Sequence, residues 1–152
     1  MGKGNHFSGP ILAGTIRQGA GQNVGSPILT QTGTIAHTDT SVTVATLPAN
    51  AQILEIVVDV TTAFNDTGTD LLDIGDGSTA NLYADNLNLA ALGRVLGSSD
   101  ASQLGNYADI GASNLSVVAT YTGQNGNASA GAARITVYYV QDGAQSDLAQ
   151  WA

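Results

Sequence analysis

The chain has 152 residues, of which 43% are hydrophobic and only 11% are charged, and its formal net charge is −8. Disordered chains combine low hydrophobicity with high charge, so this composition indicates one folded domain whose surface is poor in charge. The four cations form no cluster and cysteine is absent, which argues against binding to nucleic acid or an anionic membrane and excludes disulfides and cysteine-based metal sites.

Residues 1–27 are predicted to form an extended N-terminal arm with at most one short strand, near 11–16. The segment 18–23 is glycine-rich, and glycine loses the most backbone entropy in a regular element. The opening residues contain no apolar run of signal-peptide length, so we expect synthesis in a cytoplasm without export.

Alternating apolar residues predict strands from residue 28 onward. The first two lie at 28–35 and 40–47, and a turn follows at 48–51. The strongest strand pattern spans 52–60. Because side chains alternate between the two faces of a strand, two faces are expected there. Leu54, Ile56, Val58 and Val60 form the predicted core face, and Ile53, Glu55, Val57 and Asp59 form a mixed face.

The middle of the chain is less regular. We predict a loop at 61–69, a short strand at 70–74 and a turn at 75–78. Residues 79–97 fit two structures, since Leu89, Leu92 and Leu96 have helical spacing while Leu87 and Leu89 have strand spacing. Residues 98–114 are predicted as loop, with room for a short strand at 107–110.

Two strongly alternating segments, 115–122 and 133–140, are interpreted as an antiparallel pair joined by a loop at 123–131. The predicted fold is therefore all-β, an antiparallel β-sandwich or jelly roll. Its domain would span 28–142, between the arm and a C-terminal tail at 143–152.

Residues that could support catalysis or metal binding do not form a specific motif. His6 lies in the predicted arm, and His37 is interpreted as a surface turn residue near Asp39. The acids Asp70, Asp73, Asp76 and Asp85 could supply oxygen ligands to Ca²⁺, but their spacing does not match an EF-hand. No Gly-x-Ser-x-Gly motif is present. We predict no enzymatic activity and no cofactor.

Two stretches resemble small structural proteins from the head gene clusters of tailed bacteriophages. The first is Gly-Asn-His-Phe-Ser-Gly-Pro-Ile at 4–11, and the second is the block at 43–65, which begins Thr-Val-Ala-Thr-Leu-Pro. The similarity is clearest over residues 4–11 and 43–75. The chain thus resembles a capsid decoration, or cement, protein.

This resemblance implies a β-rich protein, often a homotrimer, that sits on the capsid exterior and bridges neighbouring major capsid proteins. It implies no catalytic residues. The low charge agrees, because few charges need desolvation on protein association, and the net negative charge suits the outer face better than the DNA-facing one.

The arm is the predicted capsid-binding segment. Its expected anchors are Phe7, Pro10, Ile11 and Leu12, with His6 as a polar contact. An alternative is that the arm packs on its own domain.

Two other functions stay open from the residues alone. A receptor-binding or tail-fibre domain would use exposed loop aromatics, for which Phe64, Tyr83 and Tyr107 are the candidates. A hydrolytic or glycan-modifying enzyme would need a convergent polar pocket, which no motif indicates.

Overall fold

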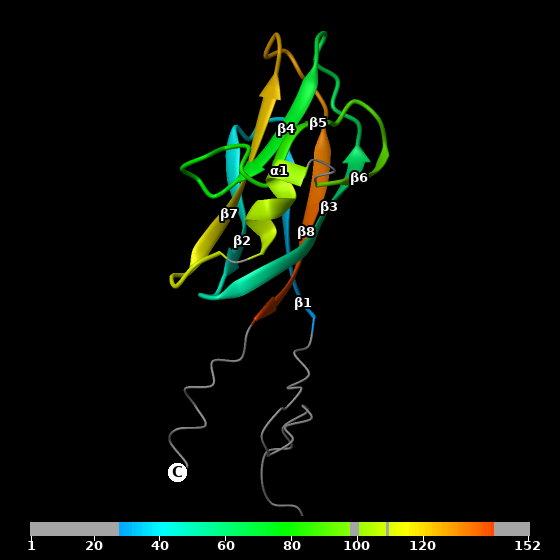
Figure 1. Ribbon diagram of the computed structural model, residues 1–152. Helices are drawn as coiled ribbons and strands as arrows, with labels where there is room; N and C mark the ends of the chain where they lie inside the picture. The colour runs from blue at the N-terminus through cyan, green and yellow to red at the C-terminus, as the bar shows by residue number, and fades with distance from the viewer. Residues whose placement is uncertain (1–27, 98–100, 109, 142–152) are drawn as a thin grey trace, which may run out of the picture.

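The computed structural model describes residues 28–97, 101–108 and 110–141. These residues form two four-stranded antiparallel sheets that pack face to face (Figure 1). The predicted all-β sandwich is therefore confirmed. The elements are β1 (Leu29–Ala36), β2 (Ser41–Leu47), β3 (Ala51–Thr62), β4 (Asp70–Gly75), β5 (Ala84–Asn88), β6 (Gly93–Leu96), α1 (Ala101–Leu104), the 3₁₀ turn η1 (Gly105–Tyr107), β7 (Leu115–Gly123) and β8 (Ala132–Gln141).

The strand order is that of a jelly roll. Sheet A has the order β1-β8-β3-β6 and sheet B has the order β2-β7-β4-β5. Strand β1 pairs with β8, β2 with β7, β3 with β6 and β4 with β5, and successive pairs alternate between the two sheets. The chain is thus a long antiparallel ribbon rolled around one core, a topology common to several β-sandwich folds.

The core lies between the sheets and follows the two-residue period of the strands. In β8 the side chains of Ala133, Ile135, Val137 and Tyr139 are buried while Arg134 is exposed. Burial of a side chain such as Ile135 or Val137 contributes about 1.5–3 kcal/mol to folding. The largest fully buried side chains are Tyr83, Ile35, Leu47, Ile56, Leu72, Ile74, Leu89, Ile135, Val58, Val117 and Val137.

Strand β3 departs from the predicted alternation. A β-bulge between Ile53 and Glu55 inserts Leu54 as an extra residue opposite β8, and an inserted residue reverses the faces on one side of the bulge. Ile53 is therefore buried, whereas Leu54 is 43% exposed. The prediction that Leu54 belongs to the core face was wrong, and so was the assignment of Ile53 to the mixed face.

Three further expectations need correction or completion. Strands β7 and β8 do not pair with each other, because they lie in different sheets and the loop between them crosses from one sheet to the other. The region 79–97 forms the strands β5 and β6 rather than a helix. The short strand expected at 107–110 is wrong, because Tyr107 ends a 3₁₀ turn.

Close contact between β1 and β2 depends on Gly33. A Cβ atom at this position would lie 2.6 Å from the Cα atom of Val44. Val44 is itself the extra residue of a bulge in β2. The amide side chain of Gln31 also joins the two strands, because it donates to the carbonyl of Thr46 (2.6 Å) and accepts from the N–H of Thr46 (2.9 Å).

The loop between β3 and β4 is organised around the buried carboxylate of Asp66. Its oxygens accept hydrogen bonds from the backbone N–H groups of Gly68 (3.0 Å), Asn125 (3.1 Å) and Asn127 (3.0 Å). Burial by itself would raise the pKa of Asp66, but the backbone N–H donors outweigh it and hold the pKa below its usual value. The network ties this loop to the β7–β8 loop at one end of the sandwich.

Candidate functional site

An apolar groove lies at the end of sheet A where the described chain begins and ends. It has a volume of about 370 Å³. Both Ile28 and Gln141 lie at this end of the sheet, because β1 and β8 are paired from Leu29 and Tyr139 onward (Figure 1). The groove is lined by Ile28, Leu54, Glu55, Ile56, Leu96, Gly97, Leu104, Tyr107 and Tyr138.

Exposed aliphatic side chains gather in this groove. Among the described residues, five large hydrophobic side chains are exposed, and four of them line the groove: Ile28, Leu54, Leu96 and Leu104. The fifth, Leu92, lies outside it. Single exposed leucines need no explanation, but a cluster of them is a feature of surfaces that bind another molecule or segment.

The short strand β6 creates the groove. It pairs only with Val57–Val60 of β3 and ends at Leu96, whereas β3 begins at Ala51. The first part of β3 therefore extends beyond its neighbour, and the bulge at Leu54 turns that side chain outward. Gly97 keeps the chain close to β3, since its N–H donates to the carbonyl of Ile56 (2.7 Å) and a Cβ would approach the Cβ of Ile56 to 2.8 Å.

The helical turn α1–η1 forms the other wall. Tyr107 is buried, its hydroxyl donates to the carbonyl of Tyr83 (3.1 Å), and the two rings meet edge to face with centroids 6.0 Å apart. Burial, followed by the nearby carboxylate of Glu55, raises the pKa of Tyr107 to about 12. The folded state therefore favours the protonated phenol, whose hydrogen bond ties η1 to Tyr83.

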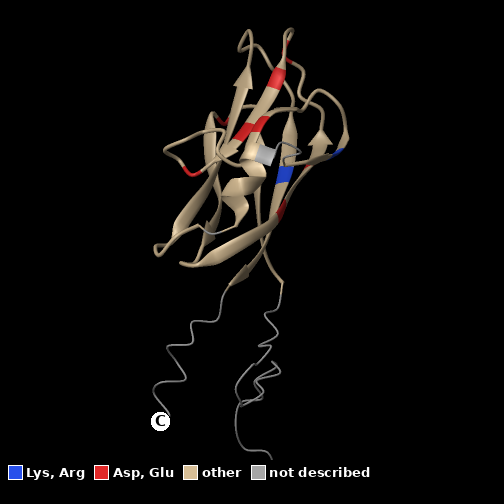
Figure 2. Ribbon diagram, viewed as in Figure 1, with Lys and Arg blue, Asp and Glu red and all other residues tan. Residues whose placement is uncertain are grey.

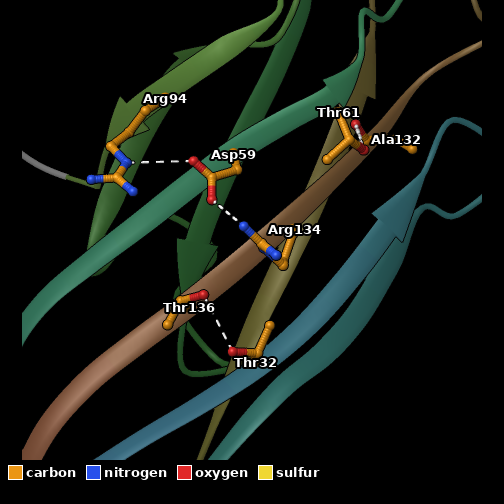
Figure 3. A network of polar contacts seen from close by, with 7 residues as sticks. All are labelled: Thr32, Asp59, Thr61, Arg94, Ala132, Arg134 and Thr136. Carbon is orange, nitrogen blue, oxygen red and sulfur yellow. Dashed lines mark hydrogen bonds and ion pairs between the residues drawn. The ribbon is translucent and has the colours of Figure 1, made fainter.

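Threonines and a small group of paired charges lie on the outer face of sheet A (Figure 3). Asp59 on β3 lies opposite Arg134 on β8 and Arg94 on β6. Arg134 donates to Asp59 Oδ2 (2.7 Å) and Arg94 to Asp59 Oδ1 (3.4 Å). The hydrogen bond from Arg134 is the main reason that the pKa of Asp59 is lowered. In the next row of the sheet, Thr32 and Thr136 share a hydrogen bond of 3.2 Å.

Charge is sparse over the rest of the sandwich (Figure 2). The described residues contain eight acids and two cations, and both cations, Arg94 and Arg134, are held by Asp59. No basic patch therefore exists in the described part of the chain. None of the helices there is long and apolar enough to cross a bilayer.

The acids considered as calcium ligands have other partners. Asp76 accepts from the backbone N–H groups of Ser78 (2.8 Å) and Thr79 (2.7 Å), which is ordinary turn chemistry. Asp73 accepts from the N–H of Asn86 (2.7 Å). Across the described ranges, no three side chains of acids or histidines lie close enough together to hold a metal ion.

The predicted arm residues lie outside the described residues. This applies to His6, Phe7, Pro10, Ile11 and Leu12, whose role stays a prediction, as do the domain boundaries at 27/28 and 142/143. The loop aromatics Phe64, Tyr83 and Tyr107 are described, and all three are buried. They are core residues and offer no exposed ring to a receptor.

Sequence reasoning missed the groove. Leu54 was assigned to the core, and Leu104 lay in a segment predicted as loop. The only signal in the sequence is Glu55, an acid that directly follows Leu54 and interrupts an otherwise apolar strand. No residue pattern indicates the bulge that exposes Leu54.

Fold and site together define a jelly-roll β-sandwich with an apolar groove on one sheet. The chain matches no protein-family model and no curated protein. Several solved structures share its fold. A chain of the cyanophage Pam1 capsid asymmetric unit matches with a TM-score of 0.60 at 22% identity, over 84% of this chain and 95% of that chain.

Two further phage capsids contain similar chains. One belongs to the acidic stable capsid structure of Helicobacter pylori bacteriophage KHP30, with a TM-score of 0.58 at 22% identity over 78% of this chain and 91% of that chain. The other belongs to the capsid of Ralstonia phage GP4, with a TM-score of 0.55 at 19% identity over 84% of this chain and 89% of that chain. At these identities the likeness establishes a shared fold, and it extends over nearly the whole of each matched chain.

Proposed function

We propose that this chain is a structural virion protein that binds the outer surface of a phage capsid and cements neighbouring major capsid proteins. The observation that supports this most directly is the shared fold with chains from three phage capsid structures, over 89–95% of those chains. A fold alone does not determine function, because jelly rolls also occur in lectins and cupins. The charge and surface of this chain therefore have to support the proposal independently.

Charge favours the outside of the shell. The chain has a net charge of −8, and the two cations of the described residues both pair with the carboxylate of Asp59. Packaged DNA would repel such a protein, since DNA binding requires cations that neutralise phosphates. A protein surface is a better partner, because few charges have to be desolvated when the sandwich associates with it.

The contact with the major capsid protein is assigned to the N-terminal arm. Its anchors are Phe7, Pro10, Ile11 and Leu12, with His6 as a polar contact. An arm with few apolar anchors can order on a groove or a strand edge of its partner. In this role the protein needs no cofactor and no catalysis. Symmetric capsid sites favour a homotrimer. Light scattering would detect the trimer as a mass of three times 15.3 kDa.

Capsids assembled without this protein provide the test. Purified full-length protein, a variant that lacks residues 1–12 and a control variant that lacks residues 143–152 are added back, and sedimentation measures the bound protein. We expect the full-length protein and the control to bind and the 1–12 deletion to fail while keeping its thermal unfolding transition. Electron microscopy of the decorated particles should place the bound protein on the exterior.

Cementing is tested separately from binding. Decorated and undecorated particles are heated, and the fluorescence of a DNA-binding dye monitors the release of DNA. We expect the decorated particles to release DNA at a higher temperature. Binding without this shift would remove the cementing role and leave decoration alone. Location on tails or inside the shell, as seen by immunogold labelling, would overturn the whole proposal and favour a tail-fibre role.

A further inference from the structure

The apolar groove in sheet A needs an occupant. It gathers four of the five exposed large hydrophobic side chains of the described residues, and water is a poor partner for such a cluster. The groove offers no convergent polar groups for a small polar ligand, since Glu55 is its only charged lining residue. Its chemistry fits an extended apolar peptide with a cation near one end.

We propose that the groove is the docking site of the chain's own N-terminal segment, residues 7–17, in the protein that is free of the capsid. The apolar residues Phe7, Ile11 and Leu12 lie against the aliphatic walls, and Arg17 lies near Glu55. The inference concerns the free protein and does not depend on the capsid role.

Chain connectivity supports this occupant. The segment joins the sandwich at Ile28, which is itself a lining residue of the groove and is 63% exposed. Residues 18–27 include Gly19, Gly21 and Gly25, so the chain can reverse direction between the docked segment and β1 at little conformational cost. A tethered segment reaches effective concentrations of about millimolar, so a weak apolar interaction suffices to fill the groove.

Charge supports it as well. Residues 1–27 contain two cations, Lys3 and Arg17, and no acid, whereas the described sandwich contains eight acids and only two cations. Glu55 is exposed, and its carboxylate has no hydrogen-bond or ion-pair partner among the described residues. A cation from the arm is the complementary group. An exposed ion pair contributes little affinity, so the apolar residues hold the segment and the charges orient it.

The first test uses the scarcity of trypsin sites. The chain has four cations, and two of them, Arg94 and Arg134, lie within strands, so early cleavage reports on Lys3 and Arg17. We expect cleavage after Arg17 in the full chain to be at least about tenfold slower than in a synthetic peptide of residues 1–27. The variant Leu104→Ser should remove most of this protection.

The matched control is Leu92→Ser. Leu92 is also an exposed leucine (68%, against 45% for Leu104) but lies outside the groove. The Leu92→Ser variant should leave the protection of Arg17 from trypsin unchanged. Thermal unfolding should verify that both variants are folded. Equal cleavage rates in the full chain and the peptide, or equal effects of both variants, would overturn the proposal.

A second experiment tests proximity and identifies which copy supplies the segment. The chain has no cysteine, so the pair Leu12→Cys and Leu104→Cys can be oxidised without competing thiols. The sixteen residues from 13 to 28 span up to roughly 50 Å, so a control pair of Leu12→Cys with Thr43→Cys on sheet B is also within reach. We expect the groove pair to form a monomeric cross-link about tenfold faster. Equal rates would contradict docking, and a cross-linked dimer that forms more slowly when the protein is diluted before oxidation would assign the groove to the arm of a second copy.

Discussion

The hydroxyl of Tyr121 donates a hydrogen bond of 2.5 Å to the carboxylate of Asp70, and both side chains are buried. Burial, together with this carboxylate, raises the pKa of Tyr121 above its usual value, so the folded state favours the protonated phenol that donates to Asp70. We expect Tyr121→Phe to lower the free energy of unfolding by about 1–3 kcal/mol, because it leaves buried Asp70 Oδ1 with only the longer hydrogen bond from the N–H of Asp66 (3.3 Å).

The control for this substitution is Tyr138→Phe. Tyr138 lies at the groove, and its hydroxyl has no hydrogen-bond partner among the described residues. Chemical denaturation should give a change close to zero for Tyr138→Phe. If both variants lose the same stability, the Tyr121–Asp70 hydrogen bond does not contribute as its burial implies.

Asp66 should make stability depend on acid pH. Its pKa is lowered in the folded protein, so the folded state favours the carboxylate more than the unfolded state does, where the pKa is about 3.9. The stabilisation is therefore complete above the unfolded-state pKa and is lost as the pH falls through the folded-state pKa. Unfolding free energies of the wild type and Asp66→Asn should differ most near pH 6 and converge as the pH falls. A difference that stays constant down to pH 2 would contradict this assignment.

Strand periodicity predicted most of the fold, because burial on one face of a strand leaves a signal with a period of two. The alternation in β8 and β7 is confirmed residue by residue, from Ala133 to Tyr139 and from Val117 to Tyr121. Pairing could not be predicted in the same way. This jelly roll places β7 and β8 in different sheets, and no local signal distinguishes that crossing from a long hairpin.

The candidate site was less predictable than the fold. It depends on the bulge at Leu54 and on the early end of β6 at Leu96, which are consequences of pairing between distant strands. A bulge at a residue without special backbone requirements leaves no mark in a single sequence. The predicted arm anchors, such as Phe7 and Ile11, belong to residues that the structure does not describe, so they stay predictions.

Gly33 should be intolerant of even the smallest side chain. A Cβ there would lie 2.6 Å from the backbone of Val44, and overpacking of this kind costs about 1–3 kcal/mol. At Gly105 a Cβ would meet nothing within 4 Å, so Gly105→Ala should be neutral or slightly stabilising. Thermal and chemical unfolding of the two alanine variants would measure this difference. If Gly33→Ala and Gly105→Ala have equal free energies of unfolding, β1 and β2 can move apart without loss of stability.

The groove and the capsid should compete for the same arm residues. If the arm is docked in nine-tenths of free molecules, the apparent affinity for the capsid is reduced about tenfold, because only the undocked fraction is competent to bind. Leu104→Ser should then bind undecorated capsids about tenfold more tightly than the wild type, and Leu92→Ser should bind like the wild type. Titration of each variant onto undecorated capsids, with sedimentation of the bound fraction, measures this. Weaker binding by Leu104→Ser would instead place the groove itself in the capsid interface, because its loss would then remove a contact rather than release the arm.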